Sequence, residues 1–310
     1  MSFKLFIYYC CLGGGWAAFV TWGILQGAGM REWESKTAYA AMTGALLGGL
    51  IAAVIGMFDA ILNSVGFQRV VRMLFCAAIG AVGGALGGFV GNGLYAKTLK
   101  EVTLDDGTKI LVGNTFILVI GWILTGIIIG ASIGLYDMIR ASLSKNDLRA
   151  PIKKTLHGIY GGFLGGLLGG LPFGMLQTNP KIPMSNLTIG LVILGLCIGL
   201  FIPVAQVILK EAWIKVEAGF RPGREIMLMK DQTLIGKGEV CDIGLFGGQG
   251  LEKQHARVVL KDGQYYLADL DTPGGTYVND ERVDRPKPLR NGDAIRVGNC
   301  VLRFNERAKR

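Results

Sequence analysis

The chain has 310 residues, of which 51% are hydrophobic and only 18% are charged, a balance too apolar for a protein that is soluble throughout. Its formal net charge is +9. The basic residues lie mainly between apolar runs rather than along one soluble face, which argues against nucleic acid as a partner. The 6 cysteines include no CxxC pair, so neither a metal site nor a disulfide framework is predicted.

Six uncharged or nearly uncharged runs occupy the first two thirds of the chain. They lie at about residues 5–25, 38–62, 73–96, 111–139, 156–176 and 184–209. Each is close to or longer than the roughly 20 residues that cross a hydrocarbon core. The sequence therefore predicts an all-α polytopic membrane bundle of about six helices. The first run lacks a convincing signal-peptide cleavage site, so we expect the protein to retain it.

The loops between these runs predict the orientation of the bundle. If the N-terminus is cytoplasmic, the cytoplasmic segments carry most of the Lys and Arg residues, as expected from the positive-inside rule. We therefore expect a multi-pass protein of the bacterial inner membrane with both termini in the cytoplasm. On the opposite side, an alternating segment around Asp106-Gly107 predicts a small external β-hairpin.

The even-numbered spans end alike, in "IGMFDAILN", "IGLYDMIRA" and "IGLFIPVAQ". Three helical hairpins derived from one repeat are the simplest interpretation. Glycines at four-residue spacing predict close helix packing of the glycine-zipper type, because small side chains let backbones approach in lipid. Spans three and five carry such rows on more than one face, which places them in the centre of the bundle or at the contact of a homo-oligomer. The packing glycines are Gly84, Gly88, Gly126, Gly130, Gly134, Gly162, Gly166 and Gly170.

Two acidic residues, Asp59 and Asp137, stand at equivalent places in the first two repeats. Charged groups in membranes often form proton or ion relays, which would favour a small-solute or ion transporter. Both acids, however, fall in the last turns of their spans at the cytoplasmic edge. There a carboxylate reaches water or pairs with a nearby cation, and this structural role is the preferred interpretation. The nearby cations are Arg69, Arg72 and Arg140.

From Glu225 onward the hydrophobic period changes to two, and short β-type runs are separated by Gly, Asp, Asn and Pro turns. This pattern predicts an all-β sandwich at residues 225–310. It follows a transmembrane domain at 1–210 and a linker at 211–224, in which we expect the last helix to continue to about Ala218. The predicted core residues are Ile226, Leu228, Ile235, Ile243, Val258, Tyr265, Leu267, Val278, Ile295, Val297, Leu302 and Phe304.

The motifs of this part resemble those of the forkhead-associated (FHA) domain. The stretches "TLIGKGEVCDIGL", "LEKQHARV", "YYLADLDTPGGTYVNDERV" and "PLRNGDAIRVGNCVLRF" follow the family's order of IGR…cDI, SRxHA, DlxSxNGTxVNG, L…GDxIxxG and a closing F. The resemblance covers residues 225 to 305. It implies a sandwich of the FHA/SMAD type whose loops bind phosphothreonine peptides through charge-assisted hydrogen bonds.

The implied peptide site departs from the family pattern at three positions. Lys237 replaces the usual arginine, which keeps the positive charge but loses the planar fork. Glu252 replaces the serine that bonds the phosphate, and its carboxylate repels that group. Gly274 replaces the asparagine that holds the peptide backbone. The other candidates match the pattern: Lys253, His255, Gly275, Thr276 and Asn279. The resemblance implies an architectural role for His255, which ties the loops together beneath the site.

Two lost or reversed contacts of about 1.5–3 kcal/mol each predict that the family's usual binding weakens by a factor on the order of hundreds. The preferred interpretation is a membrane-anchored scaffold or signalling adaptor that recruits a cytoplasmic protein without phosphate. One alternative is a phosphothreonine-dependent receptor of a Ser/Thr kinase pathway, whose partner is a phosphoprotein. The other is a transporter regulated by its FHA domain. No catalytic motif is recognised, so we predict a protein that is not an enzyme and needs no cofactor.

Overall fold

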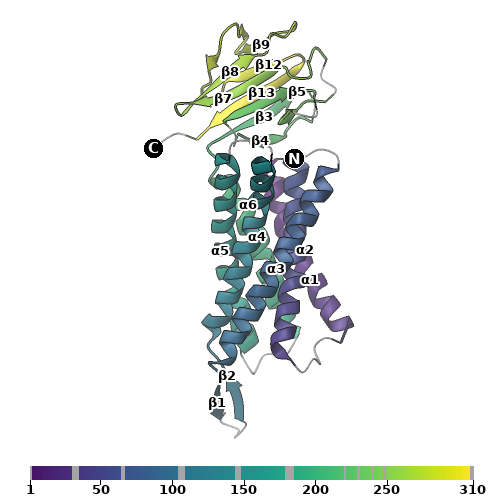
Figure 1. The fold of residues 1–310 in the computed structure, drawn as a ribbon, viewed down its shortest axis with the longest axis vertical. Coiled ribbons are helices and arrows are strands. Elements are labelled where there is room, and N and C mark those ends of the chain that lie inside the picture. The colour runs from purple at the N-terminus through teal and green to yellow at the C-terminus, as the bar shows by residue number, and fades with distance from the viewer. Residues whose placement is uncertain are drawn as a thin grey trace. The chain divides into compact units, whose positions relative to one another are not determined.

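A computed structural model describes residues 2–29, 35–63, 67–103, 109–143, 148–178, 185–219, 221–228, 231–238, 241–246 and 249–307. The chain divides into two compact units (Figure 1). The helical unit comprises Phe6–Arg140 and Ile152–Ile208, and the β unit comprises Met1–Leu5, Ala141–Pro151 and Leu209–Arg310.

Six helices of the described chain are long and apolar enough to cross a membrane, which confirms the predicted number of spans. They are α1 (Phe3–Gly27), α2 (Lys36–Asn63), α3 (Gln68–Ala96), α4 (Thr115–Leu143), α5 (Arg149–Thr178) and α6 (Ser185–Ile208). Between α3 and α4, strands β1 (Lys100–Thr103) and β2 (Lys109–Val112) pair antiparallel. The predicted hairpin is thus confirmed, although its turn at Asp106-Gly107 lies outside the described residues.

The centre of the helical unit is filled by branched aliphatic side chains from the even-numbered helices. Apart from Phe6, the largest fully buried side chains of this unit are Leu47, Ile51 and Ile55 on α2, Ile129 and Ile133 on α4, and Leu194, Ile198 and Ile202 on α6. Of the two places expected for spans three and five, the centre is therefore filled mainly by side chains of other helices, and the contact of a homo-oligomer stays a prediction. A bundle interior needs large side chains to reach native packing density, and rows of glycine cannot supply them.

Glycines instead lie where neighbouring helices approach most closely. A methyl group added to Gly84 on α3 would overlap the carbonyl oxygen of Gly44 on α2, and one added to Gly130 on α4 would overlap that of Gly158 on α5. Gly14 of α1 meets the backbone of α6 in the same way. This recurrence supports the three-repeat arrangement, which stays a prediction. Among the other named glycines, Gly88 faces α2, Gly126 and Gly134 face α5, and Gly162, Gly166 and Gly170 face α4.

The β unit contains the predicted sandwich of two sheets, with strand orders β10-β9-β12-β13-β3-β4 and β11-β8-β7-β5-β6. All the core residues named from the sequence lie in its one buried cluster, because alternate residues of each strand face inward. The strands are β3 (Ala212–Ala218), β4 (Glu225–Met227), β5 (Gln232–Gly236), β6 (Ile243–Gly244), β7 (Ala256–Lys261), β8 (Gln264–Asp269), β9 (Thr276–Val278), β10 (Glu281–Arg282), β11 (Lys287–Pro288), β12 (Ala294–Val297) and β13 (Cys300–Glu306).

Strand β3 corrects the expectation of a helical linker at 211–224. Ala212, Ile214 and Val216 are buried, and they alternate with more exposed residues, as in a strand with one face on the core. β3 pairs with β13 on one side and β4 on the other. These ladder bonds and the burial of three side chains outweigh the helical continuation that the sequence alone suggested.

Candidate functional site

The candidate peptide-binding residues lie on loops at the ends of β5, β7 and β8. Two backbone hydrogen bonds join the segment after β5 to the segment before β7. The N–H of Lys237 donates to the carbonyl of Glu252 at 3.0 Å, and the N–H of Gly238 donates to the carbonyl of Lys253 at 2.9 Å. The structure thus brings three of the predicted site residues together.

The side chains of Lys237, Glu252 and Lys253 are all exposed. In the part of the chain that the structure describes, none of the three side chains forms a hydrogen bond or an ion pair. This surface therefore offers two ammonium groups and one carboxylate to a partner. Ammonium groups are compact and strongly hydrated, so they lack the two-point geometry with which arginine holds a phosphate.

His255 is fully buried beneath these residues. Its Nδ1 accepts a hydrogen bond from the backbone N–H of Glu252 at 3.2 Å. The proton of the neutral ring is therefore on Nε2, which lies 3.2 Å from the carbonyl oxygen of Gly275 and donates to it. The imidazole links the segment before β7 to the loop between β8 and β9, so its position is structural rather than ligand-facing.

Asp269, at the end of β8, organises the same loop and was not identified from the sequence. Its carboxylate accepts hydrogen bonds from the N–H and hydroxyl of Thr272, both at 2.9 Å, and from the hydroxyl of Thr276. Burial raises the pKa of Asp269, but the hydrogen bonds from Thr276 and Thr272 together outweigh it and hold this pKa below its ordinary value of 3.8. The sequence does carry a signal for this role, because Asp269 is followed by Thr272 and Thr276, whose hydroxyl groups donate to its carboxylate.

We call the loops after β5, before β7 and between β8 and β9, which carry most of the candidate residues, the recognition loops. The remaining candidates shape the backbone of these loops and of the turn after β9. Gly275 has φ of +64°, a conformation that glycine adopts without strain. Gly274 is exposed, and a Cβ added there would lie 3.1 Å from the carbonyl oxygen of Gly250. Asn279 donates from Nδ2 to Asp293 at 2.9 Å and accepts at Oδ1 from the N–H of Ala294 at 2.9 Å. Asn279 therefore ties the turn after β9 to the start of β12.

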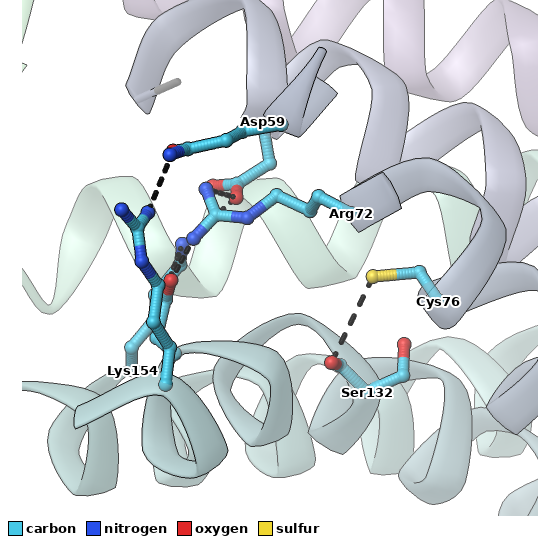
Figure 2. A network of polar contacts seen from close by, with 8 residues as sticks. Asp59, Arg72, Cys76, Ser132 and Lys154 are labelled. Atoms are coloured by element: carbon cyan, nitrogen blue, oxygen red, sulfur yellow. Dashed lines mark hydrogen bonds and ion pairs between the residues drawn. The ribbon is translucent and has the colours of Figure 1, made fainter. Parts of the chain in front are cut away.

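A second polar site lies in the helical unit, where Asp59, Arg72, Asp137 and Lys154, from four helices, form a ring of ion pairs. Figure 2 labels Asp59, Arg72 and Lys154 of this charge ring. Asp59 Oδ2 is 2.7 Å from Arg72 Nη1 and 2.8 Å from Lys154 Nζ. Asp137 binds the same two cations, with Lys154 Nζ at 2.9 Å from Oδ2. Among these four described residues, each charge pairs with two of opposite sign, and the four charges together cancel.

The charge ring is almost closed to solvent. The exposed side-chain fraction is 2% for Asp59, 4% for Arg72, 7% for Lys154 and 24% for Asp137. Of the predicted partners, Arg72 pairs with both acids, while Arg140 donates to Gln68 at 2.7 Å. Buried ions need this pairing, because desolvating an unpaired charge costs several kcal/mol.

Sequence reasoning missed Lys154 as a member of this ring. Lys154 is 95 residues from Asp59, too far for any local pattern to reveal the contact. A signal did exist in the repeat: Arg72 follows Asp59 by 13 residues, and Lys154 follows Asp137 by 17. Both repeats therefore place an acid near the end of one helix and a cation near the start of the next.

Comparison with known proteins agrees with the architecture of the β unit. The family model of the FHA domain matches residues 233–298. The glycogen accumulation regulator GarA of Mycolicibacterium smegmatis is 32% identical over 94 residues, which are 30% of this chain and 58% of that protein. The E3 ubiquitin-protein ligase CHFR of Xenopus laevis is 34% identical over 86 residues, which are 26% of this chain and 13% of that protein. The chain thus spans less than two thirds of either relative.

Solved structures with a similar domain include the FhaA FHA domain in complex with the intracellular domain of Rv3910, at 26% identity and a TM-score of 0.28, covering 30% of this chain and 99% of that one. Another comes from an analysis of phosphothreonine-dependent FHA domain interactions, at 25% identity and a TM-score of 0.30, covering 32% of this chain and 100% of that one. The family model identifies residues 233–298 as an FHA domain, in a chain with six helices of the described residues long and apolar enough to cross a membrane.

Proposed function

We propose that the protein is a membrane-anchored, non-enzymatic adaptor whose FHA domain binds a cytoplasmic protein without reading phosphothreonine. The observation that carries this proposal is the exposed carboxylate of Glu252, which stands where the FHA pattern has a phosphate-binding serine. Its backbone is hydrogen-bonded to Lys237, so the carboxylate belongs to the surface that an approaching phosphate would meet. A phosphate carries nearly two negative charges at neutral pH and is repelled there.

The supporting structure of the loops is nevertheless retained. His255, Gly275, Thr276 and Asn279 all lie in the hydrogen-bonded framework that shapes the recognition end. A surface that keeps its framework but loses its phosphate contacts suits binding of a protein by shape and ordinary polar contacts. Anchoring the domain at a membrane would raise its effective concentration for partners confined to the same surface.

The six apolar helices support the anchoring role. The distribution of basic residues between them favours the inner membrane of a bacterial cell with both termini in the cytoplasm. The exposed apolar residues of α3, such as Val82, Leu86 and Phe89, suit contact with lipid. The named glycines already contact helices of the same chain, so two copies of the bundle would associate through other faces.

Transport has weaker support than anchoring. Most of the largest fully buried side chains of the helical unit are leucine and isoleucine, and these offer an ion or polar solute no ligands. In the charge ring, Asp59 and Asp137 are each bound by Arg72 and Lys154. A carboxylate that already has two cationic partners is poorly suited to bind a transported cation.

A phosphothreonine-dependent receptor is the second candidate, and the two exposed lysines favour it. Lys237 and Lys253 have no ion-pair partner in the described chain, so both are available to a phosphate that approaches from a direction different from that of the family's usual mode. This candidate requires Glu252 to turn aside.

Affinity capture with the full chain in lipid nanodiscs tests the proposal. The bait would be exposed to cytoplasmic lysate, with and without phosphatase treatment, and bound proteins would be identified by mass spectrometry. We expect the same partner from both lysates, and its loss with the triple variant Lys237→Ala, Glu252→Ala, Lys253→Ala. An Arg290→Gln bait, altered at an exposed position elsewhere on the domain, should retain it. A partner that disappears after phosphatase treatment would instead support the receptor.

A further inference from the structure

The FHA domain has a hollow of about 530 Å³ whose lining does not include the exposed Lys237 and Lys253. Its walls include Arg257 on β7, Arg282 on β10 and Arg285 in the segment that follows β10. Ala268 and Val283 contribute small apolar surfaces. We call this hollow the arginine groove.

Two of the three arginines have no polar partner within the described residues. Arg282 Nε is 3.6 Å from Asp284 Oδ1, so this cation is already paired. Arg257 and Arg285 are exposed and form no ion pair with the residues that the structure describes. Two guanidinium groups therefore face the groove without a counter-ion.

The three arginines and three aspartates of the groove cancel formally, but no carboxylate of the groove is paired with Arg257 or Arg285 in the part of the chain that the structure describes. Asp269 already accepts hydrogen bonds from Thr272 and Thr276, and Asp284 is paired with Arg282. Only Asp271, at an exposed turn with φ of +54°, adds an uncommitted negative charge. Two unpaired guanidinium groups therefore face one uncommitted carboxylate, and this local imbalance favours an anionic ligand beside Arg257 and Arg285.

The arginine groove is continuous with the recognition loops. Thr272 and Pro273 of the loop between β8 and β9 line one end of it. A Cβ added to Gly275 would lie 3.2 Å from Arg282 Nε, so the arginine packs directly over the glycine whose carbonyl binds His255. A chain that contacts the recognition loops can therefore continue into the groove.

We propose that the arginine groove binds an extended acidic segment of the partner protein, whose Asp or Glu carboxylates pair with Arg257 and Arg285. Planar guanidinium groups hold carboxylates through two parallel hydrogen bonds, and the small Ala268 and Val283 side chains let a peptide backbone approach. Asp271 would repel a doubly charged phosphate more strongly than a carboxylate. The inference rests on the proposed function, that this domain binds a protein partner.

Fluorescence anisotropy with the full chain in nanodiscs of zwitterionic lipid tests this inference. The probes are a fluorescein-labelled peptide of alternating Ser and Glu, and a matched peptide of alternating Ser and Gln. We expect the Glu peptide to bind at least about tenfold more tightly, and the double variant Arg257→Gln, Arg285→Gln to weaken its binding by about tenfold. Asp271→Asn should tighten binding about two- to threefold, because it removes a repulsive charge without straining the turn.

The control is Arg290→Gln, which removes one positive charge from the same domain outside the groove. If Arg290→Gln weakens binding of the Glu peptide as much as the groove variant does, the effect comes from the overall charge of the domain and the proposal is overturned. Equal binding of the Glu and Gln peptides would also overturn it. Tighter, groove-dependent binding of a peptide carrying phosphothreonine would also overturn it. If the lysate partner still binds the double groove variant, the inference fails while the adaptor stands. If the wild-type chain captures no partner from lysate but binds the Glu peptide in the groove, the adaptor proposal fails and the proposal of an anion-binding groove stands.

Discussion

Arg72 and Lys154 donate hydrogen bonds to the same atom, Oδ2 of Asp59, over 2.7 and 2.8 Å. The two cations come from α3 and α5, and the acceptor comes from α2. One carboxylate oxygen thus joins α2 to the next helix, α3, and to α5, whose Lys154 is 95 residues from Asp59 in the sequence. The side chains of the charge ring are almost fully buried. If one of them is removed, water cannot reach the remaining charges to take its place.

Asp59→Asn should destabilise the helical unit by about 3–5 kcal/mol, since two buried cations are left with one acid. Thermal unfolding in detergent, followed by circular dichroism, measures the effect. The charge-balanced double variant Asp59→Asn, Lys154→Gln should cost less than the sum of the two single changes, because the members of the ring are coupled. Strictly additive costs would show that the four residues do not act as one network.

Gly84→Ala should destabilise the helical unit by about 1–3 kcal/mol or more, because the new methyl group overlaps the backbone of Gly44. Gly93→Ala is the matched control on the same helix, with no atom within 4 Å of the added Cβ. The control should be neutral or up to about 1 kcal/mol more stable, as alanine favours helix. Equal melting temperatures for both variants in detergent would argue against close contact between α2 and α3.

Asp269 makes the stability of the FHA domain depend on pH in the acidic range. Its pKa lies below the ordinary 3.8 in the folded protein, burial being outweighed by hydrogen bonds from Thr276 and Thr272. The resulting stability is fully present above the unfolded pKa and is lost as pH falls through the folded value. Asp269→Asn should therefore be less stable than wild type near neutrality, and the difference should shrink below about pH 4. Hydrogen exchange in β8 and β9, compared at equal pH, measures it; a constant difference would refute the assignment.

Phosphate recognition should be restored by two substitutions. Glu252→Ser with Gly274→Asn removes the repulsive carboxylate and returns the missing backbone contact, so phosphothreonine peptides should bind on the order of a hundredfold more tightly. Gly250 must shift by a few tenths of an ångström, since a Cβ at position 274 lies 3.1 Å from its carbonyl. Titration of the full chain with paired phosphorylated and unphosphorylated peptides checks this. Tight phosphopeptide binding by the unaltered chain would remove the basis of the adaptor proposal.

The sandwich core could be predicted from the sequence because its strands alternate regularly, with Ile295 and Val297 as one example of buried alternate residues. Strand β3 could not be predicted in the same way. Its alternation spans few residues and directly follows an apolar helix, so helix and strand were both compatible with the local pattern. The pairing of β3 with β13 decides the outcome, and β13 lies at the other end of the domain sequence.

The candidate sites show the same division between local and distant information. Motif spacing singled out His255, and the structure shows its ring hydrogen-bonded to the backbone of Glu252, a neighbour in sequence. The partnership of Lys154 with Asp59 depends on how four helices pack, and no short motif encodes that. The arginine groove likewise forms from separate strands, so Arg257 and Arg285 stand out only after folding.

The inner position of β3 also affects how the domain responds to a protease. β3 is joined to β13 along most of its length, from Ala212 opposite Glu306 to Ala218 opposite Val301. A cut between Gly219 and Arg224 would sever the polypeptide but leave these ladder bonds and the buried side chains in place. Nicking there should not release the FHA domain into solution, and a recombinant fragment that starts after the nick would expose a bare sheet edge prone to self-association.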